Sequence, residues 1–304
     1  MCGIIGYCGR RPAVPVIIEG LRRLEYRGYD SSGVAYVQNK RLKIIRAEGK
    51  LGKLEEKLQD ADMLTATSGM GHTRWATHGL PVERNAHPHV SNDGCVAVVH
   101  NGIIENFQEL REELKALGHV FQSETDTETL AHLISEGRKK TGDVGEALSW
   151  ALSKVDGAYA LVVVCQDEPG VLWAARKSSP LVLGAGAGEN FLASDVPAFL
   201  PYTREAVFLD DGELVRLDAS SWRVMDAATL APVDKTVHHV AWDIQSAQKG
   251  GHKHFMIKEI FEQPRVIADC LTGRFDKEGR FDLSELAGLP VPDRLHIVAC
   301  GTSY

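Results

Sequence analysis

The order in which strand and helix patterns follow one another constrains the fold of this chain most. Small and apolar residues predict an early set of strands, at 2–8, 33–38, 41–47, 68–75 and 95–100. Apolar residues at helical spacing predict helices, at 13–26, 107–117, 125 onward and 143–155. An apolar strand is predicted over 157–166, and strands and turns dominate from there to Arg223. Strands, then helices, then strands again indicate an α+β fold with antiparallel sheets.

Short polar signals mark where several of these elements begin and turn. Asn39-Lys40 separates two strand patterns and predicts a hairpin. Thr125 and Glu128 have the spacing of a capping box, which predicts a helix start there. The glycine-rich segment 184–188 precedes a strand pattern rather than a helix, so we interpret it as a turn and not as a nucleotide loop.

The composition changes near Gln245. Residues 245–251 are polar and glycine-rich, which is typical of a linker. A helix is predicted over 255–262, ending before Pro264, and residues 296–304 resemble a buried strand that runs into a Gly-Thr-Ser turn. A lone parallel strand cannot bury itself or satisfy its edges, so we interpret this end as a truncated second domain. The predicted regions are a first domain over 1–240, a linker with its helix over 241–292, and the start of a second domain over 293–304.

The composition argues against several classes of protein. The chain has 304 residues and a net charge of −7, and no Lys/Arg run is dense enough for a nucleic-acid or membrane patch. No apolar run approaches the ~18 residues of a membrane span, and the N-terminus lacks the pattern of a secretory signal. The six cysteines form no CxxC pair, so we expect reduced thiols in the cytosol rather than a disulfide framework.

Cys2 is the residue with the most direct chemical meaning. Initiator methionine is usually trimmed before a small residue, so we expect Cys2 to carry both a thiol and a free α-amine. The α-amine titrates near pKa ~7.7–8.0 and a free thiol near ~8.5, so the amine is a well-matched base for the thiol. The alternative is that Cys2 is a small apolar residue opening a buried strand.

The segment 71–79 gathers charged, hydroxyl, imidazole and indole groups between two turn signals. Arg74 at a strand's end can clamp a carboxylate through two parallel hydrogen bonds, although a structural ion pair is an equally simple explanation. Zinc is a further candidate, because four histidines lie near one another in sequence: His72, His78, His87 and His89. No HExxH or Cys/His ligand spacing supports such a site, so we predict neither a metal nor a cofactor.

Asn101-Gly102 follows a predicted strand and has two interpretations. Asn-Gly is the strongest short signal for a hairpin turn. Alternatively, the Asn101 side-chain amide and the Gly102 N–H form an oxyanion hole, with glycine allowing close approach to a substrate. Asp126 is either a helix N-terminal residue stabilised by the helix dipole or a partner for a substrate ammonium. With Arg74, it would then recognise both ends of an α-amino acid.

Taken together, these motifs resemble the glutamine amidotransferases of the N-terminal-nucleophile class. They are most similar to the glutamine–fructose-6-phosphate aminotransferases, the branch that forms an amino sugar. The similar segments are Met1–Gly6, Arg22–Ser31, Gly71–Gly79, Asn85–His89, His100–Asn106, Ser123–Glu128, His254–Pro264 and Cys300–Tyr304. The resemblance therefore spans the whole chain, and the last two segments point to the sugar-forming branch.

The resemblance implies a fold and a mechanism. The fold would be the four-layer αββα sandwich of the N-terminal-nucleophile hydrolases, two antiparallel sheets covered by helices. Cys2 would attack the glutamine amide with its own α-amine as base, giving a γ-glutamyl thioester and ammonia. Asn101 and Gly102 would hold the oxyanion. The implied glutamine-binding residues are Arg74, Trp75, Thr77, His78 and Asp126.

The resemblance also implies a second domain, a sugar-phosphate isomerase that converts fructose 6-phosphate and ammonia into glucosamine 6-phosphate. Thr302 and Ser303 would begin its phosphate site, and its other groups would lie downstream. We therefore expect glutaminase activity without amino-sugar synthesis. The resemblance further implies a cytoplasmic homodimer for the full-length enzyme, whereas this piece could be monomeric, with no nucleic-acid or membrane partner for either.

Two alternatives remain open on the sequence. The chain could be the glutaminase half of another amidotransferase, one with a phosphoribosyl- or ATP-binding second domain. It could instead be a non-catalytic module that senses a sugar phosphate or binds a partner. Retention of Met1 would favour that second alternative, because an amide nitrogen at Cys2 has no useful basicity.

Overall fold

The computed structural model describes residues 2–58, 65–76, 79–241, 252, 255–271 and 294. The chain separates into two compact units, Met1–Gln248 and Lys249–Tyr304. None of the helices among the described residues is long and apolar enough to cross a membrane.

The first unit contains a large antiparallel sheet, sheet A. Its eight described strands run in the order β14 (His238–His239), β11 (Glu205–Phe208), β9 (Val182–Ala185), β10 (Asn190–Ala193), β1 (Gly3–Cys8), β4 (Ser68–Arg74), β2 (Ser31–Gln38) and β3 (Arg41–Glu48). The chain's first strand thus lies near the middle of the sheet, paired with β10 and β4.

A second antiparallel sheet, sheet B, faces the first. Its six described strands run in the order β13 (Trp222–Asp226), β12 (Glu213–Leu217), β8 (Leu172–Lys177), β7 (Gly157–Cys165), β6 (Val96–Ile104) and β5 (His89–Val90). Every strand pairing in both sheets is antiparallel, as the order of elements predicts.

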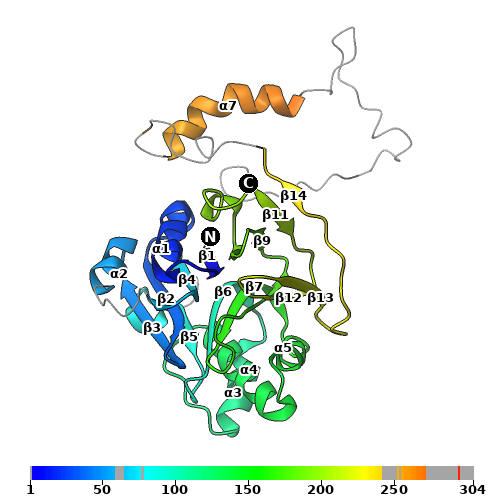
Figure 1. Cartoon of the computed structure of the whole chain (residues 1–304). Coiled ribbons are helices and arrows are strands. Elements are labelled where there is room, and N and C mark those ends of the chain that lie inside the picture. Colours follow the sequence, from blue (N-terminus) through cyan, green and yellow to red (C-terminus); the bar gives the residue numbers. More distant parts are fainter. Residues whose placement is uncertain are drawn as a thin grey trace. The chain divides into compact units, whose positions relative to one another are not determined.

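Helices cover the outer face of each sheet. Helices α1 (Ala13–Leu24) and α2 (Leu51–Lys57) pack on sheet A, while α3 (Phe107–Ala116), α4 (Thr127–Thr141) and α5 (Val144–Leu152) form the layer outside sheet B (Figure 1). Three separate apolar clusters hold the layers together, one under each set of helices and one between the sheets. This confirms the predicted four-layer αββα sandwich.

The amphipathic pattern of α1 explains how this helix packs. Ile17, Leu21 and Leu24 recur at helical spacing, and all three are fully buried against sheet A. Burying each such side chain contributes on the order of 1.5–3 kcal/mol. The observed helix ends at Leu24, slightly before the predicted end at residue 26, because a 3₁₀ turn follows from Glu25 to Arg27.

The Asn39-Lys40 hairpin is confirmed, with φ of 49° and 58° at its two residues.

The capping box predicted for Thr125 and Glu128 is wrong, because Glu128 accepts hydrogen bonds from other residues. Helix α4 begins at Thr127, and the Glu128 carboxylate accepts the backbone N–H groups of Gln122 (2.8 Å) and Ser123 (2.7 Å) instead of that of Thr125. The loop before α4 folds back over the first turn of the helix, so the amides of this loop, rather than that of Thr125, donate to the Glu128 carboxylate.

The second unit contributes one described helix, α7 (Phe255–Leu271). The predicted end before Pro264 is wrong, because α7 continues through this proline to Leu271. A proline removes one backbone hydrogen bond, but Pro264 and the residues beside it are exposed, so water can satisfy the carbonyl that loses its donor. The predicted linker at 245–251 and the strand at 296–304 lie outside the described residues.

Candidate active site

Three strands change from apolar to polar along the face they turn toward the other sheet. Ile4 on β1, Met70 on β4 and Val99 on β6 belong to the apolar cluster between the sheets. Side chains two residues apart on a strand share a face. The next residues on these faces are polar, namely Cys2, His72 with Arg74, and Asn101. The alternation of the strands therefore carries these four residues to one end of the layer between the sheets.

These polar ends open into a cavity of about 350 Å³. Six predicted site residues line it: Cys2, Arg74, Trp75, Asn101, Gly102 and Asp126. The pairing of β1 with β4 places Gly3 opposite Thr73, which brings Cys2 beside Arg74. These six residues come from four separate parts of the first unit and meet at one site.

The Cys2 thiol contacts the backbone that follows β4. The Trp75 N–H donates to Cys2 Sγ at 3.2 Å, and the Trp75 carbonyl oxygen lies 3.5 Å from the same sulfur. Burial raises the pKa of the Cys2 thiol, although the Trp75 backbone contact opposes that shift. A thiol held neutral in this way needs a nearby base before it can act as a nucleophile.

Asn101 spans the space between Cys2 and His72. Its Nδ2 donates to the Cys2 carbonyl oxygen at 3.0 Å, and its Oδ1 lies 2.9 Å from His72 Nε2. Strand β6 continues to Ile104, so Asn101-Gly102 lies within a strand and the hairpin interpretation is wrong. Pairing of β6 with the long β7 overrides the local turn preference.

Gly102 is required by the backbone at this point. Its φ is +133°, and a Cβ there would lie 2.0 Å from the Ala158 carbonyl oxygen. Any side chain would therefore clash with the neighbouring strand. Gly102 is exposed and lines the cavity beside Asn101.

Arg74 and Asp126 supply opposite charges to the same cavity. The Arg74 guanidinium donates to the carbonyl oxygens of Leu80 (3.2 Å) and Gly79 (3.4 Å). Burial lowers the pKa of Arg74, but an arginine remains charged at neutral pH. Asp126, at the N-terminus of α4, accepts the Ile104 N–H at 2.9 Å. Among the predicted site residues, the cavity therefore offers one cation and one anion to a ligand that carries both charges, and Arg27 also lines it.

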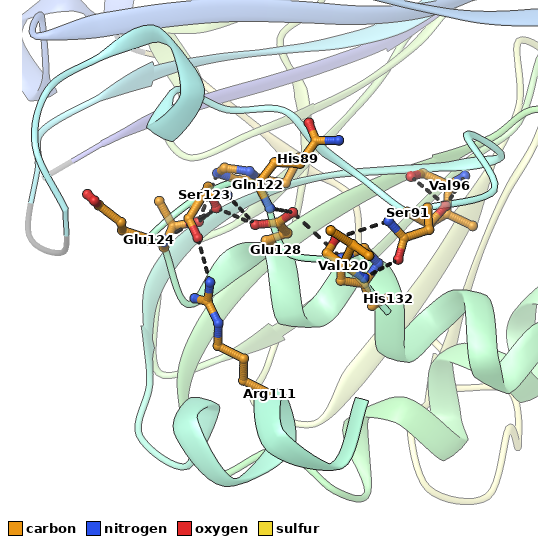
Figure 2. A network of polar contacts seen from close by, with 12 residues as sticks. His89, Ser91, Val96, Arg111, Val120, Gln122, Ser123, Glu124, Glu128 and His132 are labelled. Atoms are coloured by element: carbon orange, nitrogen blue, oxygen red, sulfur yellow. Dashed lines mark hydrogen bonds and ion pairs between the residues drawn. The ribbon is translucent and has the colours of Figure 1, made fainter. Parts of the chain in front are cut away.

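A buried polar network fixes the loop that carries Asp126 (Figure 2). Ser123 Oγ donates to Glu128 at 2.6 Å and lies 3.0 Å from Thr125 Oγ1, which in turn lies 2.9 Å from His89 Nε2. Arg111 donates to the Ser123 carbonyl oxygen at 2.8 Å. Burial alone would raise the pKa of Glu128, but hydrogen bonds from neighbouring side chains and backbone lower it to about 2. The ionised carboxylate therefore ties the loop to α4.

Sequence reasoning missed several residues that line the cavity, namely Arg27, His87, His100, Thr125, Thr127 and the turn Ser178–Pro180. Arg27 donates through Nε to the Cys2 carbonyl oxygen at 3.1 Å. Arg27 belongs to the similar segment Arg22–Ser31, but its residue type and spacing do not predict a place in the site. The Ser178–Pro180 turn directly follows β8, and the folding of this strand into sheet B brings the turn to the cavity.

Three of the four histidines considered as zinc ligands, His72, His87 and His89, bond to protein groups. The His100 N–H donates to His87 Nδ1 at 3.2 Å, and the rings of His72 and His87 stack with centroids 4.1 Å apart. Burial lowers the pKa of both His72 and His89 to about 3. Within the described part of the chain, no three or more His, Cys, Asp or Glu side chains are grouped so as to hold a metal ion.

Four other predicted site residues, Thr77, His78, Thr302 and Ser303, lie outside the described residues.

Comparison with known proteins adds to this geometry. A model of the glutamine amidotransferase domain matches residues 72–201. The whole chain is 51% identical to glutamine–fructose-6-phosphate aminotransferase (isomerizing) of Pyrococcus horikoshii, and equally to that of Thermus thermophilus. It spans about half the length of these relatives, 50% in each case.

A solved structure supports the fold. Glutamine phosphoribosylpyrophosphate amidotransferase from B. subtilis, complexed with ADP and GMP, matches 75% of this chain and 50% of its own, with a TM-score of 0.64 and 25% identity. A second structure, an allosteric regulatory enzyme of purine biosynthesis, matches 76% of this chain with a TM-score of 0.63.

Proposed function

The chain belongs to the glutamine amidotransferases, and on that premise we propose that Cys2 releases ammonia from the side-chain amide of glutamine. The observation that carries the proposal is one cavity lined by Cys2, Asn101, Gly102, Arg74 and Asp126. It combines a nucleophile, amide donors and two opposite charges, which is what the hydrolysis of an α-amino acid's side-chain amide needs.

The first step needs the free α-amine of Cys2, and hence removal of Met1. The amine takes the thiol proton, and Sγ attacks the amide carbon of glutamine to give a tetrahedral intermediate. The C–N bond then breaks as the ammonium returns the proton, which releases ammonia and leaves a γ-glutamyl thioester. Water attacks the thioester, with the same amine as base, and releases glutamate. Because burial raises the pKa of the thiol, an attached base is needed to generate the thiolate.

The negative oxygen of the intermediate would be held by Asn101 Nδ2 and the Gly102 N–H. Asn101 Nδ2 already donates a hydrogen bond of 3.0 Å to the Cys2 carbonyl oxygen, so the donor lies beside the residue that carries the nucleophile. Such a donor contributes about 2.7–4 kcal/mol to transition-state stabilisation. Arg74 and Asp126 would bind the α-carboxylate and α-ammonium of glutamine, with Trp75, Thr77 and His78 completing the binding residues.

We also propose that the ammonia aminates fructose 6-phosphate in a longer protein. The support is the 51% identity to two proteins named glutamine–fructose-6-phosphate aminotransferase (isomerizing), which are twice as long as this chain. A cytoplasmic homodimer and a phosphate site that begins at Thr302 and Ser303 follow from the same resemblance. Incubation of the 304-residue chain with glutamine and fructose 6-phosphate should yield glutamate and no glucosamine 6-phosphate. Formation of the amino sugar would contradict the proposal that amination of fructose 6-phosphate needs the longer protein.

The central test combines mass spectrometry with kinetics. After brief exposure to a diazoketone analogue of glutamine, the intact chain should lack Met1 and carry one label on Cys2. The Cys2→Ala variant should stay unlabelled and should release no glutamate from glutamine, while it unfolds at a temperature close to that of the parent. A trimmed chain that neither labels nor hydrolyses glutamine would refute the proposal, and a chain that retains Met1 would favour a non-catalytic module.

A further inference from the structure

We propose that His72 is a positioning residue, which holds the Asn101 amide in the one orientation that presents Nδ2 to the nucleophile. His72 lies on β4, behind Asn101 as seen from Cys2, and does not itself line the cavity. Its Nε2 lies 2.9 Å from Asn101 Oδ1, while Asn101 Nδ2 donates to the Cys2 carbonyl oxygen. The inference rests on the oxyanion role proposed for Asn101.

The two contacts of Asn101 determine which His72 tautomer fits. The Cys2 carbonyl oxygen only accepts, so the Asn101 NH₂ must face it. Asn101 Oδ1 then faces His72 and only accepts, so His72 Nε2 must carry the proton. His72 is fully buried, and its Nδ1 has no hydrogen-bond partner among the described residues. Burial also lowers the pKa of His72 to about 3, so the ring stays neutral near pH 7.

The opposite orientation of the amide would be penalised at both ends. With the amide flipped, Asn101 Oδ1 would face the Cys2 carbonyl oxygen, and two acceptors would meet. At the other end the Asn101 NH₂ would face His72 Nε2, which could accept from it only if the His72 proton moved to Nδ1, a buried atom with no hydrogen-bond partner among the described residues. A buried polar group without a partner costs about 1–3 kcal/mol, so the observed orientation is strongly preferred.

The His72 ring is itself held in place. It stacks on His87 with centroids 4.1 Å apart and an interplanar angle of 15°. His87 is fixed in turn, because its Nδ1 accepts the backbone N–H of His100 on β6. Since Asn101 follows His100 on the same strand, the stack ties His72 to the strand that carries its hydrogen-bond partner.

The kinetic test compares two variants of His72. His72→Leu removes the donor and should lower kcat for glutamine by about 10-fold or more, up to the ~10²–10³-fold known for loss of an oxyanion donor. The KM for glutamine should change little, because Arg74 and Asp126 are untouched. His72→Gln can place an amide N–H near the position of Nε2, so it should recover most of kcat. His119→Leu, which removes another buried histidine outside the cavity, is the matched control and should leave kcat unchanged.

A double-mutant cycle separates positioning from general damage. If His72 acts through Asn101, then His72→Leu should change kcat less than about 2-fold in an Asn101→Ala background. Additive losses would overturn the inference and leave the proposed function intact. If Asn101→Ala alone keeps its kcat, the oxyanion role of Asn101 fails first, and the inference fails with it.

Nitrogen NMR tests the orientation without any activity. In the ¹⁵N-labelled 304-residue chain, the His72 signals, assigned by their loss in His72→Gln, should show protonated Nε2 and unprotonated Nδ1. They should stay constant between about pH 8 and pH 5.5, where an unperturbed histidine titrates. A protonated Nδ1, or titration in this range, would overturn the inference.

Discussion

The layer between the two sheets has an apolar part and a polar end, and the same strands build both. On β1 the fully buried Ile4 lies one pleat from Cys2, and on β6 the fully buried Val99 lies one pleat from Asn101. The apolar part is filled by side chains that only need to fit one another. At the polar end, the contacts of Cys2 and Asn101 depend on which atom donates and which accepts.

The two parts of one strand therefore have different roles, because the apolar residues stabilise the fold and the polar residues take part in the reaction. Apolar contacts are non-directional, so the core tolerates conservative substitution at modest cost. Buried polar groups cost free energy unless each has a partner, so the polar end is specified atom by atom. Substitutions in the apolar part should therefore change stability, and those at the polar end should change turnover or substrate binding.

Asn101→Ala tests the polar end most severely. Loss of the Nδ2 donor should lower kcat for glutamine by about 10²–10³-fold, equivalent to about 2.7–4 kcal/mol. The KM for glutamine should stay within a few-fold, as measured by steady-state glutamate release. An unchanged kcat would remove the distinction between the two parts of the layer.

Acidification should weaken the polar end through its buried histidines. Burial lowers the pKa values of His72, His87, His89 and His100 in the folded state. The unfolded chain therefore takes up protons below pH ~6.5 that the folded chain does not, so the free energy of unfolding decreases as the pH is lowered. Between pH 7.5 and 6.0 the loss should reach about 0.8 kcal/mol per histidine, roughly 3 kcal/mol in all.

Urea unfolding at the two pH values measures this loss. The His89→Gln variant should show a shallower pH dependence, because one buried imidazole is gone. Carboxylates are already ionised over this range, so a free energy of unfolding that is independent of pH would contradict the assignment of neutral, buried histidines.

Arg74→Lys should affect binding rather than turnover. Lysine keeps the charge but cannot make two parallel hydrogen bonds to a carboxylate. Loss of one hydrogen bond to a charged group costs about 1.5–3 kcal/mol, so the KM for glutamine should rise by roughly 10–100-fold. The kcat should change much less, and a fall in kcat at constant KM would argue against a role in holding the carboxylate.

Ile4→Val gives the smallest expected effect and defines the apolar side of the comparison. Deleting one buried methylene group should lower the free energy of unfolding by about 0.5–1.5 kcal/mol. The kcat and KM for glutamine should match those of the parent, although Ile4 is only two residues from Cys2. Denaturant unfolding and glutamate release on the same preparation measure both quantities.

The predictable parts of the fold are those that local pattern controls. The hairpin at Asn39-Lys40, the buried face of α1 and the succession of strands and helices along the chain follow from spacing alone. Two of the errors occur where a tertiary partner outweighs a local preference. Asn101-Gly102 lies within β6 because β7 pairs with it, and Glu128 bonds to Gln122 and Ser123 because the loop folds back over α4.

The sequence by itself determined the chemistry of the site, because residue types fix what each group can do. A cysteine after the initiator methionine, an arginine, an aspartate and an Asn-Gly pair indicate a nucleophile, two charges and oxyanion donors. Only the tertiary structure decided which way those groups face. The orientation of the Asn101 amide depends on the carbonyl oxygen of Cys2, just before β1, and on His72 of β4, both distant in sequence. Hydrogen bonds are directional, so their partners can be assigned only when the strands have been brought together.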